Sequence, residues 1–316
     1  MQEIKYSFVL PAYKARFFRE AIDSILAQTY KDFELIIVND ASPEDLDSIV
    51  NSYNDSRIRY YVNEQNIGGK DLVAQWNHCL EYAKGEYIIL ASDDDVYFPQ
   101  YLEKMDALVQ KYPEVNVFRP RYRGIDENGN VQYETIRCNI KISAVEFVYL
   151  LMECNIGSGI PFYVFNKDKL ISLGGFVNFP MGWGADDATV MLMAKNGMCI
   201  EDEVLFSFRM SGINISTRHD LSVVKKKIQS DRLLYKFYQE YINTLPIESD
   251  EDKSNIVFLK NNCKKTFRSR TASELNLMSF GEAIKITPKL LRLPWSNTFF
   301  ILKRIFKKVF QIIMTE

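Results

Sequence analysis

Three consecutive aspartates, Asp93, Asp94 and Asp95, follow directly after the apolar run YIIL at residues 87–90. Neighbouring carboxylates disfavour one another's ionised form, so a triplet at the end of a buried strand adds little to folding by itself. One interpretation is a solvated loop, because short acidic clusters are common. The other is a cation site, because carboxylates hold Mg²⁺ or Mn²⁺ together with the oxygens of a diphosphate.

The composition excludes several classes of protein. The 316 residues allow one large α/β domain with an appendage, or two domains, and the apolar fraction of 47% is enough for a core. A net charge of −2 creates no field that attracts nucleic acid, so no nucleic-acid partner is expected. Five cysteines without a CxxC pair argue against a disulfide framework and fit a cytoplasmic protein. Two histidines exclude a histidine-rich metal centre, and neither a signal peptide nor a membrane span is predicted.

The first hundred residues alternate between short apolar runs and helical patterns. Phe18, Ile22, Ile25 and Leu26 share one face of a predicted helix, and a second helix is predicted over about 70–83. The predicted strands are residues 5–10, 33–38, 58–62 and 86–91. This alternation predicts a mostly parallel α/β sheet with helices on both faces.

Ligands of such sheets bind beyond the carboxyl ends of the strands. Three of these ends are followed by PAYK at 11–14, NDAS at 39–42 and SDDD at 92–95. We therefore expect Tyr13, Asp40 and the acidic triplet on one rim. Neither GxGxxG nor GxxxxGK[ST] occurs, so a dinucleotide site or a P-loop is not predicted. A divalent cation held by the acids is the expected means of binding phosphate.

Three ordered blocks resemble the family-2 glycosyltransferases. The first is FVLPAYKARFFREAIDSILAQTYKDFELIIVNDASPEDL, and the second is NIGGKDLVAQWNHCLEYAKGEYIILASDDDVYFPQYL, which holds the family's metal-binding DXD motif. The third, LGGFVNFPMGWGADDATVMLMAKNG at 173–197, corresponds to the segment with the family's acidic catalytic pair. The resemblance covers about residues 4–216. It implies the GT-A fold, a Rossmann-like, mostly parallel sheet with helices on both faces.

The resemblance also implies an activity. It is the transfer of a sugar, with inversion, from a nucleotide-diphosphate sugar (a UDP-sugar) to a hydroxyl of a saccharide or lipid-linked saccharide acceptor. The implied cofactor is Mn²⁺ or Mg²⁺, and the implied process is the synthesis of a cell-surface polysaccharide such as capsule, O-antigen or exopolysaccharide. Two alternatives stay open. One is a nucleotidyltransferase of related fold, although PAYKARFF lacks its Gly-rich, lysine-containing loop. The other is a non-catalytic nucleotide-sugar-binding module, against which the complete set of acids argues.

A nucleotide site is implied at the first two strand ends. The aromatic ring of Tyr13 would stack on the base, with a core position as the alternative. Asp40 would accept a hydrogen bond from the uracil imide. A loop that begins at Asn66 would close over the nucleotide. The residues implied in this site are Pro11, Ala12, Tyr13, Asp40, Asn66 and Gly68.

The third strand end is the implied metal site. Asp95 aligns best as the metal ligand. Asp93 or Asp94 would reach the ribose or a metal-bound water, which makes Asp93 the second candidate for the metal.

The third block carries the implied catalytic residues. Asp187, with Asp186 beside it, would be the general base, although both acids would also favour a helix N-terminus through its dipole. Trp183, between two glycines, is either a platform for the acceptor or a packing residue.

Three positions depart from the family pattern. Asn39 replaces a frequent acid, so the site carries one charge less, and Trp76 stands where many members have an arginine. Ser211 replaces a frequent histidine. His219 is either its substitute or a histidine in an exposed loop.

The last third of the chain reads as helical. We expect a GT-A catalytic domain over 1–220, with a nucleotide-sugar half at about 1–98 and an acceptor half at about 99–220, and a helical region over 221–316. The final helix sets Leu302, Ile305, Phe306, Val309 and Ile313 on one face, and residues 285–316 contain seven basic residues and one acid. A basic amphipathic helix of this kind is typical of an anionic membrane surface. It predicts a peripheral position on the inner face of the cell membrane, with packing or a dimer contact as the alternative.

Overall fold

A computed structural model of the chain describes residues 4–153, 155–212 and 217–313, with side chains as far as residue 306. The chain forms two compact units. The first comprises Met1–Asn178 and Ala185–Gly212, and the second comprises Phe179–Gly184 and Ile213–Glu316. We call them the sheet unit and the helical unit.

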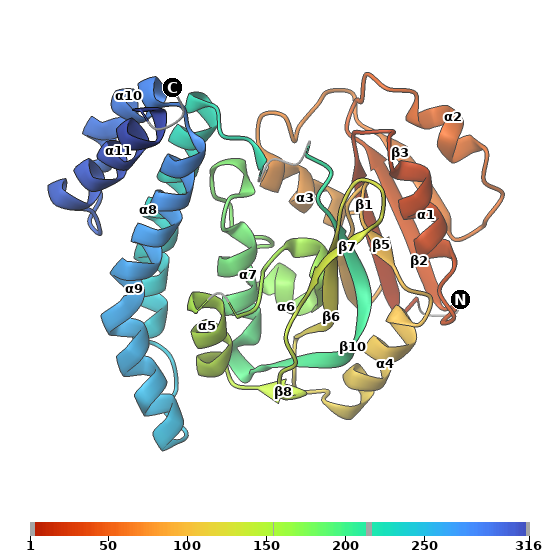
Figure 1. Ribbon diagram of the computed structural model, residues 1–316. Coiled ribbons are helices and arrows are strands. Elements are labelled where there is room, and N and C mark those ends of the chain that lie inside the picture. The colour runs from red at the N-terminus through yellow and green to blue at the C-terminus, as the bar shows by residue number, and fades with distance from the viewer. Residues whose placement is uncertain (1–3, 154, 213–216, 314–316) are drawn as a thin grey trace. The chain divides into compact units, whose positions relative to one another are not determined.

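The sheet unit is built on one mixed sheet (Figure 1). Among the described residues its strands run in the order β3-β2-β1-β4-β9-β6-β10-β5, with β7 beside β6 and β8 beside β10. The pairs among β1 to β4 and the pair β6–β10 are parallel, and the other pairs are antiparallel. The strands are β1 Tyr6–Ala12, β2 Phe33–Asn39, β3 Ile58–Val62, β4 Tyr87–Leu90, β5 Val96–Tyr97, β6 Val117–Ile125, β7 Val131–Glu134, β8 Lys141–Ile142, β9 Val164–Asn166 and β10 Met198–Arg209.

The predicted α/β fold is confirmed, and its four N-terminal strands lie where the apolar runs predicted them. All seven residues of β2 are buried, as expected for a strand covered on both faces. The stripe predicted for α1 is buried at Phe18, Ile22 and Ile25. α3 packs against β1, and α4 packs against β6 and β10. The helices of this unit are α1 Phe18–Leu26, α2 Leu46–Asn51, α3 Leu72–Leu80, α4 Tyr101–Lys111, α5 Ala144–Met152, α6 Lys167–Ser172 and α7 Ala185–Met193.

The strand order brings the candidate loops together. β1 lies between β2 and β4, and all three run in the same direction. Their carboxyl ends therefore lie side by side on one edge of the sheet. The main-chain N–H of Asp40 donates to the carbonyl oxygen of Ala12 at 3.0 Å, which joins the first two ends.

The helical unit consists of α8 Leu221–Ile242, α9 Asp250–Leu277, α10 Phe280–Leu290 and α11 Thr298–Ile313. Its core contains Trp295, which is fully buried with its ring centroid 4.9 Å from that of Tyr235 and 5.1 Å from that of Phe267. Residues 243–249 join α8 to α9. Ser249 caps α9 by accepting from the N–H of Asp252, and the acids that follow occupy the first turn, where the helix dipole favours them.

The amphipathic pattern of α11 is found in part. Phe299, Leu302 and Phe306 are exposed, whereas Ile301 is fully buried. Val309 and Ile313, which were also predicted on the apolar face, lie outside the described side chains. In the part of the chain that the structure describes, no helix is both long and apolar enough to cross a bilayer.

Candidate active site

The acidic triplet lies at the edge where the three parallel strands end. Asp93 Oδ2 accepts from the main-chain N–H groups of Tyr13 at 3.0 Å and Lys14 at 2.8 Å, so it ties the end of β4 to the loop after β1. Asp93, Asp94 and Asp95 are 9%, 7% and 1% exposed. The interpretation of the triplet as a solvated loop is therefore wrong.

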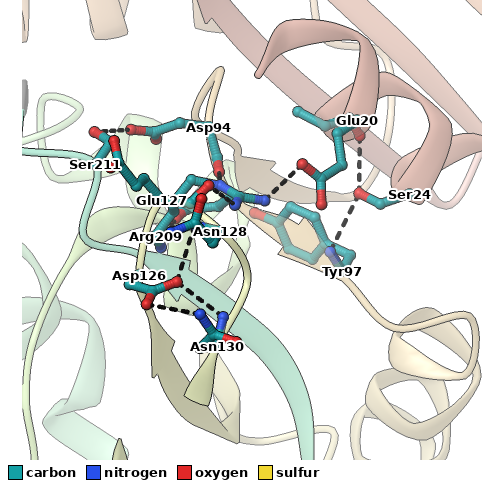
Figure 2. A network of polar contacts seen from close by, with 12 residues as sticks. Glu20, Ser24, Asp94, Tyr97, Asp126, Glu127, Asn128, Asn130, Arg209 and Ser211 are labelled. Carbon is teal, nitrogen blue, oxygen red and sulfur yellow. Dashed lines mark hydrogen bonds and ion pairs between the residues drawn. The ribbon is translucent and has the colours of Figure 1, made fainter. Parts of the chain in front are cut away.

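Arg209 is the basic residue next to the triplet. Its main-chain N–H donates to Asp95 Oδ1 at 2.8 Å, and its Nε donates to the carbonyl oxygen of Asp94 at 2.8 Å. Its Nη2 lies 2.6 Å from Oε2 of Glu20, and its guanidinium lies 4.3 Å from the ring of Phe17. Figure 2 shows Arg209 between Asp94 and Glu20. The arginine therefore holds the acidic loop mainly through the main chain.

Burial controls the protonation of the triplet. It raises the pKa of Asp93, and the neighbouring charge of Asp94 raises it further. Burial and the same charge also raise the pKa of Asp95, in spite of hydrogen bonds from the Ser92 hydroxyl and the Arg209 main chain. A cation bound beside these carboxylates would lower both pKa values, because an opposite charge favours the ionised form.

The triplet fits a divalent cation held jointly with a diphosphate. Across the described residues, no three His, Cys, Asp or Glu side chains gather into a site able to hold a metal on their own. Mg²⁺ and Mn²⁺ need only one or two protein carboxylates when phosphate oxygens complete the coordination. Each oxygen of Asp95 accepts one hydrogen bond, from Ser92 or from Arg209, and so keeps a second lone pair. The hard oxygen donors suit Mg²⁺ or Mn²⁺.

Asp40 organises the loop after β3. Its Oδ1 accepts from Asn63 Nδ2 and from the N–H of Ile67, each at 2.8 Å. Its Oδ2 accepts from Asn66 Nδ2 at 3.1 Å and from the N–H of Gly68 at 2.7 Å. A carboxylate has about four acceptor positions, so these four donors occupy them. A Cβ at Gly68 would lie 2.9 Å from Asp40 Oδ2, so this close approach favours glycine.

The residues implied to line the base lie at the end of β1. Tyr13 is 42% exposed, so its interpretation as a core residue is wrong and its ring is open to a ligand. Pro11 is half-buried and Ala12 is fully buried. The Ser42 hydroxyl donates to the carbonyl oxygen of Tyr13 at 2.6 Å, which fixes the turn that presents the ring.

The implied catalytic pair lies in the first turn of α7. Asp187 is 6% exposed and Asp186 is half-buried. The Thr189 hydroxyl, in the same helix, accepts from the N–H of Val177 at 2.9 Å. Both proposed roles of the pair, as a general base and as a partner of the helix dipole, agree with this position.

Trp183 lies in the helical unit. Its indole Nε1 donates to Asp231 Oδ1 at 3.1 Å, and Lys227 Nζ lies 4.4 Å from the ring centroid. His219 is in the same unit, in the irregular segment before α8, where it is half-buried with Nδ1 3.1 Å from Oε2 of Glu274. The acceptor role of Trp183 stays a prediction.

Sequence reasoning missed three residues of the site. Arg209 and Glu20 carry the ion pair beside the triplet, and the Ser211 hydroxyl donates to Asp94 Oδ2 at 3.2 Å. From the sequence, Ser211 stands out only as a departure from the family pattern. A signal for Arg209 was present in the sequence, because the arginine ends the apolar strand run VLFSF.

The fold and the site define a class of protein. Parallel strands whose carboxyl ends carry a buried acidic triplet are the core of a GT-A nucleotide-sugar transferase fold. Two solved structures share it. One is Staphylococcus aureus TarS 1–349 in complex with UDP, with a TM-score of 0.65, 17% identity, and coverage of 92% of this chain and 78% of that one. The other is the Pyrobaculum calidifontis mannosyltransferase PcManGT with GDP-Man and Mn²⁺, with a TM-score of 0.51, 15% identity, and coverage of 97% and 87%.

The chain belongs to glycosyl transferase family 2, whose profile matches residues 7–167. Glycosyltransferase GlyG of Streptococcus pneumoniae is 28% identical over 229 residues, which are 68% of this chain and 74% of GlyG. An uncharacterised glycosyltransferase of Rickettsia bellii is 37% identical over 131 residues, which are 40% of this chain and 18% of that protein. The chain spans between 18% and 34% of the length of four such Rickettsia relatives.

Proposed function

We propose that the protein is an inverting glycosyltransferase that moves a sugar from a UDP-sugar to an acceptor hydroxyl. The observation that carries the proposal is the buried triplet Asp93–Asp95, which is bonded to the loop after β1 and lies on the same edge of the sheet as the end of β2. TarS was solved with UDP and with UDP-GlcNAc, and PcManGT with GDP-Man, which supports a nucleotide-sugar donor.

The proposed donor site assigns a task to each loop. The ring of Tyr13 stacks on the base, beside Pro11 and Ala12. Asp40 holds the loop with Asn66 and Gly68 in shape through the four hydrogen bonds described above. Its predicted contact with the uracil imide would compete with those donors. We therefore propose that the main role of Asp40 is to hold the loop.

The triplet supplies the ligands of the proposed Mn²⁺ or Mg²⁺. Asp95 and Asp94 are the proposed ligands, because Asp93 already holds the loop after β1. The bound metal would neutralise charge on the departing diphosphate, as a Lewis acid. The PcManGT complex with Mn²⁺ supports this choice of cofactor.

The proposed base is Asp187, with Asp186 beside it. The acceptor oxygen forms a bond to the anomeric carbon while the bond from that carbon to the diphosphate oxygen breaks. Attack from the face opposite the leaving group inverts the centre, and the acceptor proton passes to the Asp187 carboxylate. An ordinary carboxylate is a weak base, but its proton transfer can follow bond breaking at an oxocarbenium-like centre.

The proposed acceptor is a saccharide or a lipid-linked saccharide of a surface polysaccharide. The exposed Phe299, Leu302 and Phe306, with Lys303 and Arg304 between them, support attachment of α11 to an anionic membrane surface. A peripheral position on the inner face of the cell membrane would then bring the active site near such an acceptor.

One experiment tests the proposal against its alternatives. The full chain is incubated with a panel of UDP-sugars and Mn²⁺, and released UDP and acceptor products are measured. We expect UDP release with at least one donor and its loss in EDTA. Release of pyrophosphate from a nucleoside triphosphate and a sugar phosphate would indicate a nucleotidyltransferase. UDP-sugar binding without any release would indicate a non-catalytic module.

A further inference from the structure

The segment Phe179–Gly184 belongs to the helical unit, although it directly precedes the candidate catalytic helix α7 in sequence. We propose that Trp183 latches this segment onto α8 and α9, and that the latch fixes where α7 begins. Trp183 is then a positioning residue for Asp187. This second part rests on the function proposed above, whereas the latch itself does not.

Residues on one face of α8 contact the segment Phe179–Gly184. The Ser230 hydroxyl donates to the carbonyl oxygen of Pro180 at 2.7 Å, and Asp231 accepts from the indole of Trp183. Lys227 lies over the indole, and a Cβ at Gly184 would lie 2.7 Å from Leu234 Cδ2. Positions 227, 230, 231 and 234 follow the i, i+3, i+4, i+7 spacing of a single helix face.

The backbone of the segment is held in an unusual conformation. Met181 has a φ of 62°, and Gly182 and Gly184 have φ values of 68° and 79°. A left-handed conformation is unfavourable for a methionine, and such conformations persist where the surroundings fix them. The contacts with α8 supply that fixation.

Charged side chains from both α8 and α9 surround the indole of Trp183. Lys227, Asp231 and Glu274 are 0%, 1% and 6% exposed. Lys227 Nζ lies 3.0 Å from Glu274 Oε1, and Arg270 Nε lies 2.9 Å from Asp231 Oδ1 with its guanidinium 5.4 Å from the indole. Two cations and two carboxylates thus balance around one ring.

This arrangement fixes the orientation of the Trp183 indole in addition to packing against it. Burying the charges of Lys227, Asp231 and Glu274 costs stability unless they are paired, and a tryptophan that only fills space needs no charged neighbours. The cations interact with the ring face, and the carboxylate accepts from its edge, so the indole has one orientation that satisfies all of them. The chain passes from Gly184 directly into Ala185, the first residue of α7. A displaced indole would therefore displace the turn that carries Asp187.

The test uses two latch variants and a matched control in the full chain. Trp183→Leu removes the ring, and Asp231→Asn weakens its hydrogen bond. Trp295→Phe is the control, because Trp295 is a tryptophan of the helical unit that also donates an indole hydrogen bond, to Thr271 at 3.0 Å. Trp183→Phe keeps a ring face for the cations and serves as the conservative variant.

We expect amide hydrogen exchange over residues 185–193 to speed up in Trp183→Leu and Asp231→Asn, and not in Trp295→Phe. We also expect kcat to fall about ten- to a hundredfold in Trp183→Leu with little change in the KM for the donor, since misplacing a catalytic group by about 1 Å has an effect of that size. Trp183→Phe should recover part of the loss.

Unchanged exchange over 185–193 in both latch variants would overturn the latch. Faster exchange with an unchanged kcat would overturn the positioning role. If the parent protein turns over no donor, the proposed function fails, and the exchange data still decide whether the latch exists.

Discussion

The guanidinium of Arg209 meets Asp94 at its main-chain carbonyl oxygen, with an Nε–O distance of 2.8 Å. This contact of the guanidinium with the loop therefore does not depend on the charge of the Asp94 carboxylate. It also leaves the negative charge of the triplet available to a cation. A direct ion pair between the guanidinium and a carboxylate would instead compete with such a cation.

Replacing Arg209 tests this relationship. In Arg209→Lys the Nε donor and the planar contact with Phe17 are lost, which leaves a buried carbonyl oxygen without its partner. We expect the free energy of unfolding to fall by about 1–3 kcal/mol, the usual cost of an unsatisfied buried group. Urea unfolding measures it. Arg16→Lys is the control, because Arg16 also lies over Phe17, at 4.8 Å, but is exposed. Equal losses in the two variants would contradict the assignment.

The metal proposal predicts a metal-dependent loss of nucleotide affinity. Asp95→Asn and Asp94→Asn should each weaken UDP binding about tenfold or more in Mn²⁺, a scale typical of damage to a metal site, and should change it little in EDTA. Isothermal titration calorimetry measures both conditions. Glu81→Gln removes an exposed charge at the end of α3 and should bind UDP as the parent does. Full activity of the parent in EDTA would contradict the prediction.

Asp187→Asn should reduce turnover by about 10²- to 10⁴-fold, the range for removal of a general base. UDP affinity in Mn²⁺ should stay near that of the parent, because the base acts on the acceptor. Steady-state kinetics with an acceptor, beside Asp186→Asn, distinguishes the two neighbours. A loss in Asp186→Asn alone would reverse their roles. No loss in either variant would mean that both acids only stabilise the N-terminus of the helix through its dipole.

The N-cap of α8 predicts a stability change in acid. Hydrogen bonds from the Ser222 side chain and the Val223 main chain lower the pKa of Asp220 from 3.8 to about 2. Because the folded-state pKa is the lower one, the stabilisation is complete above pH 3.8 and is lost as the pH falls towards 2. Asp220→Asn should lack this part of the pH dependence. Urea midpoints of both proteins between pH 5 and pH 2 measure it, and parallel curves would contradict it.

Membrane attachment through α11 predicts cosedimentation with anionic vesicles that weakens in high salt, because each basic residue near such a surface contributes about 1 kcal/mol. Substitutions suit the test better than truncation after Pro294, which would remove the buried Trp295. Leu302→Ser together with Phe306→Ser should reduce binding. Leu233→Ser on α8, where the leucine is 43% exposed like Leu302, should not. A parent protein that stays in the supernatant at low salt would contradict the prediction.

The sequence predicted what depends on local periodicity. Apolar runs located β1 to β4, and parallel topology then placed Tyr13, Asp40 and the triplet on one edge. It could not show that Asp40 is occupied by four donors, because the loop at 63–68 has no periodic pattern. Nor could the sequence show which side chains surround Trp183. The indole contacts Lys227, Asp231 and Arg270, which are more than 40 positions away in the chain and share no local pattern with it.

The way Asp40 holds its loop has a consequence for how donor preference can diverge. Two of its four donors are main-chain N–H groups, and the other two come from Asn63 and Asn66. Glu64 and Gln65 lie between those asparagines, are exposed, and take no part in the anchor. Mutational drift at these two positions can therefore change the chemistry of the loop surface while its backbone is preserved. A combinatorial library restricted to Glu64 and Gln65 is a direct way to search for altered sugar selectivity without loss of folding.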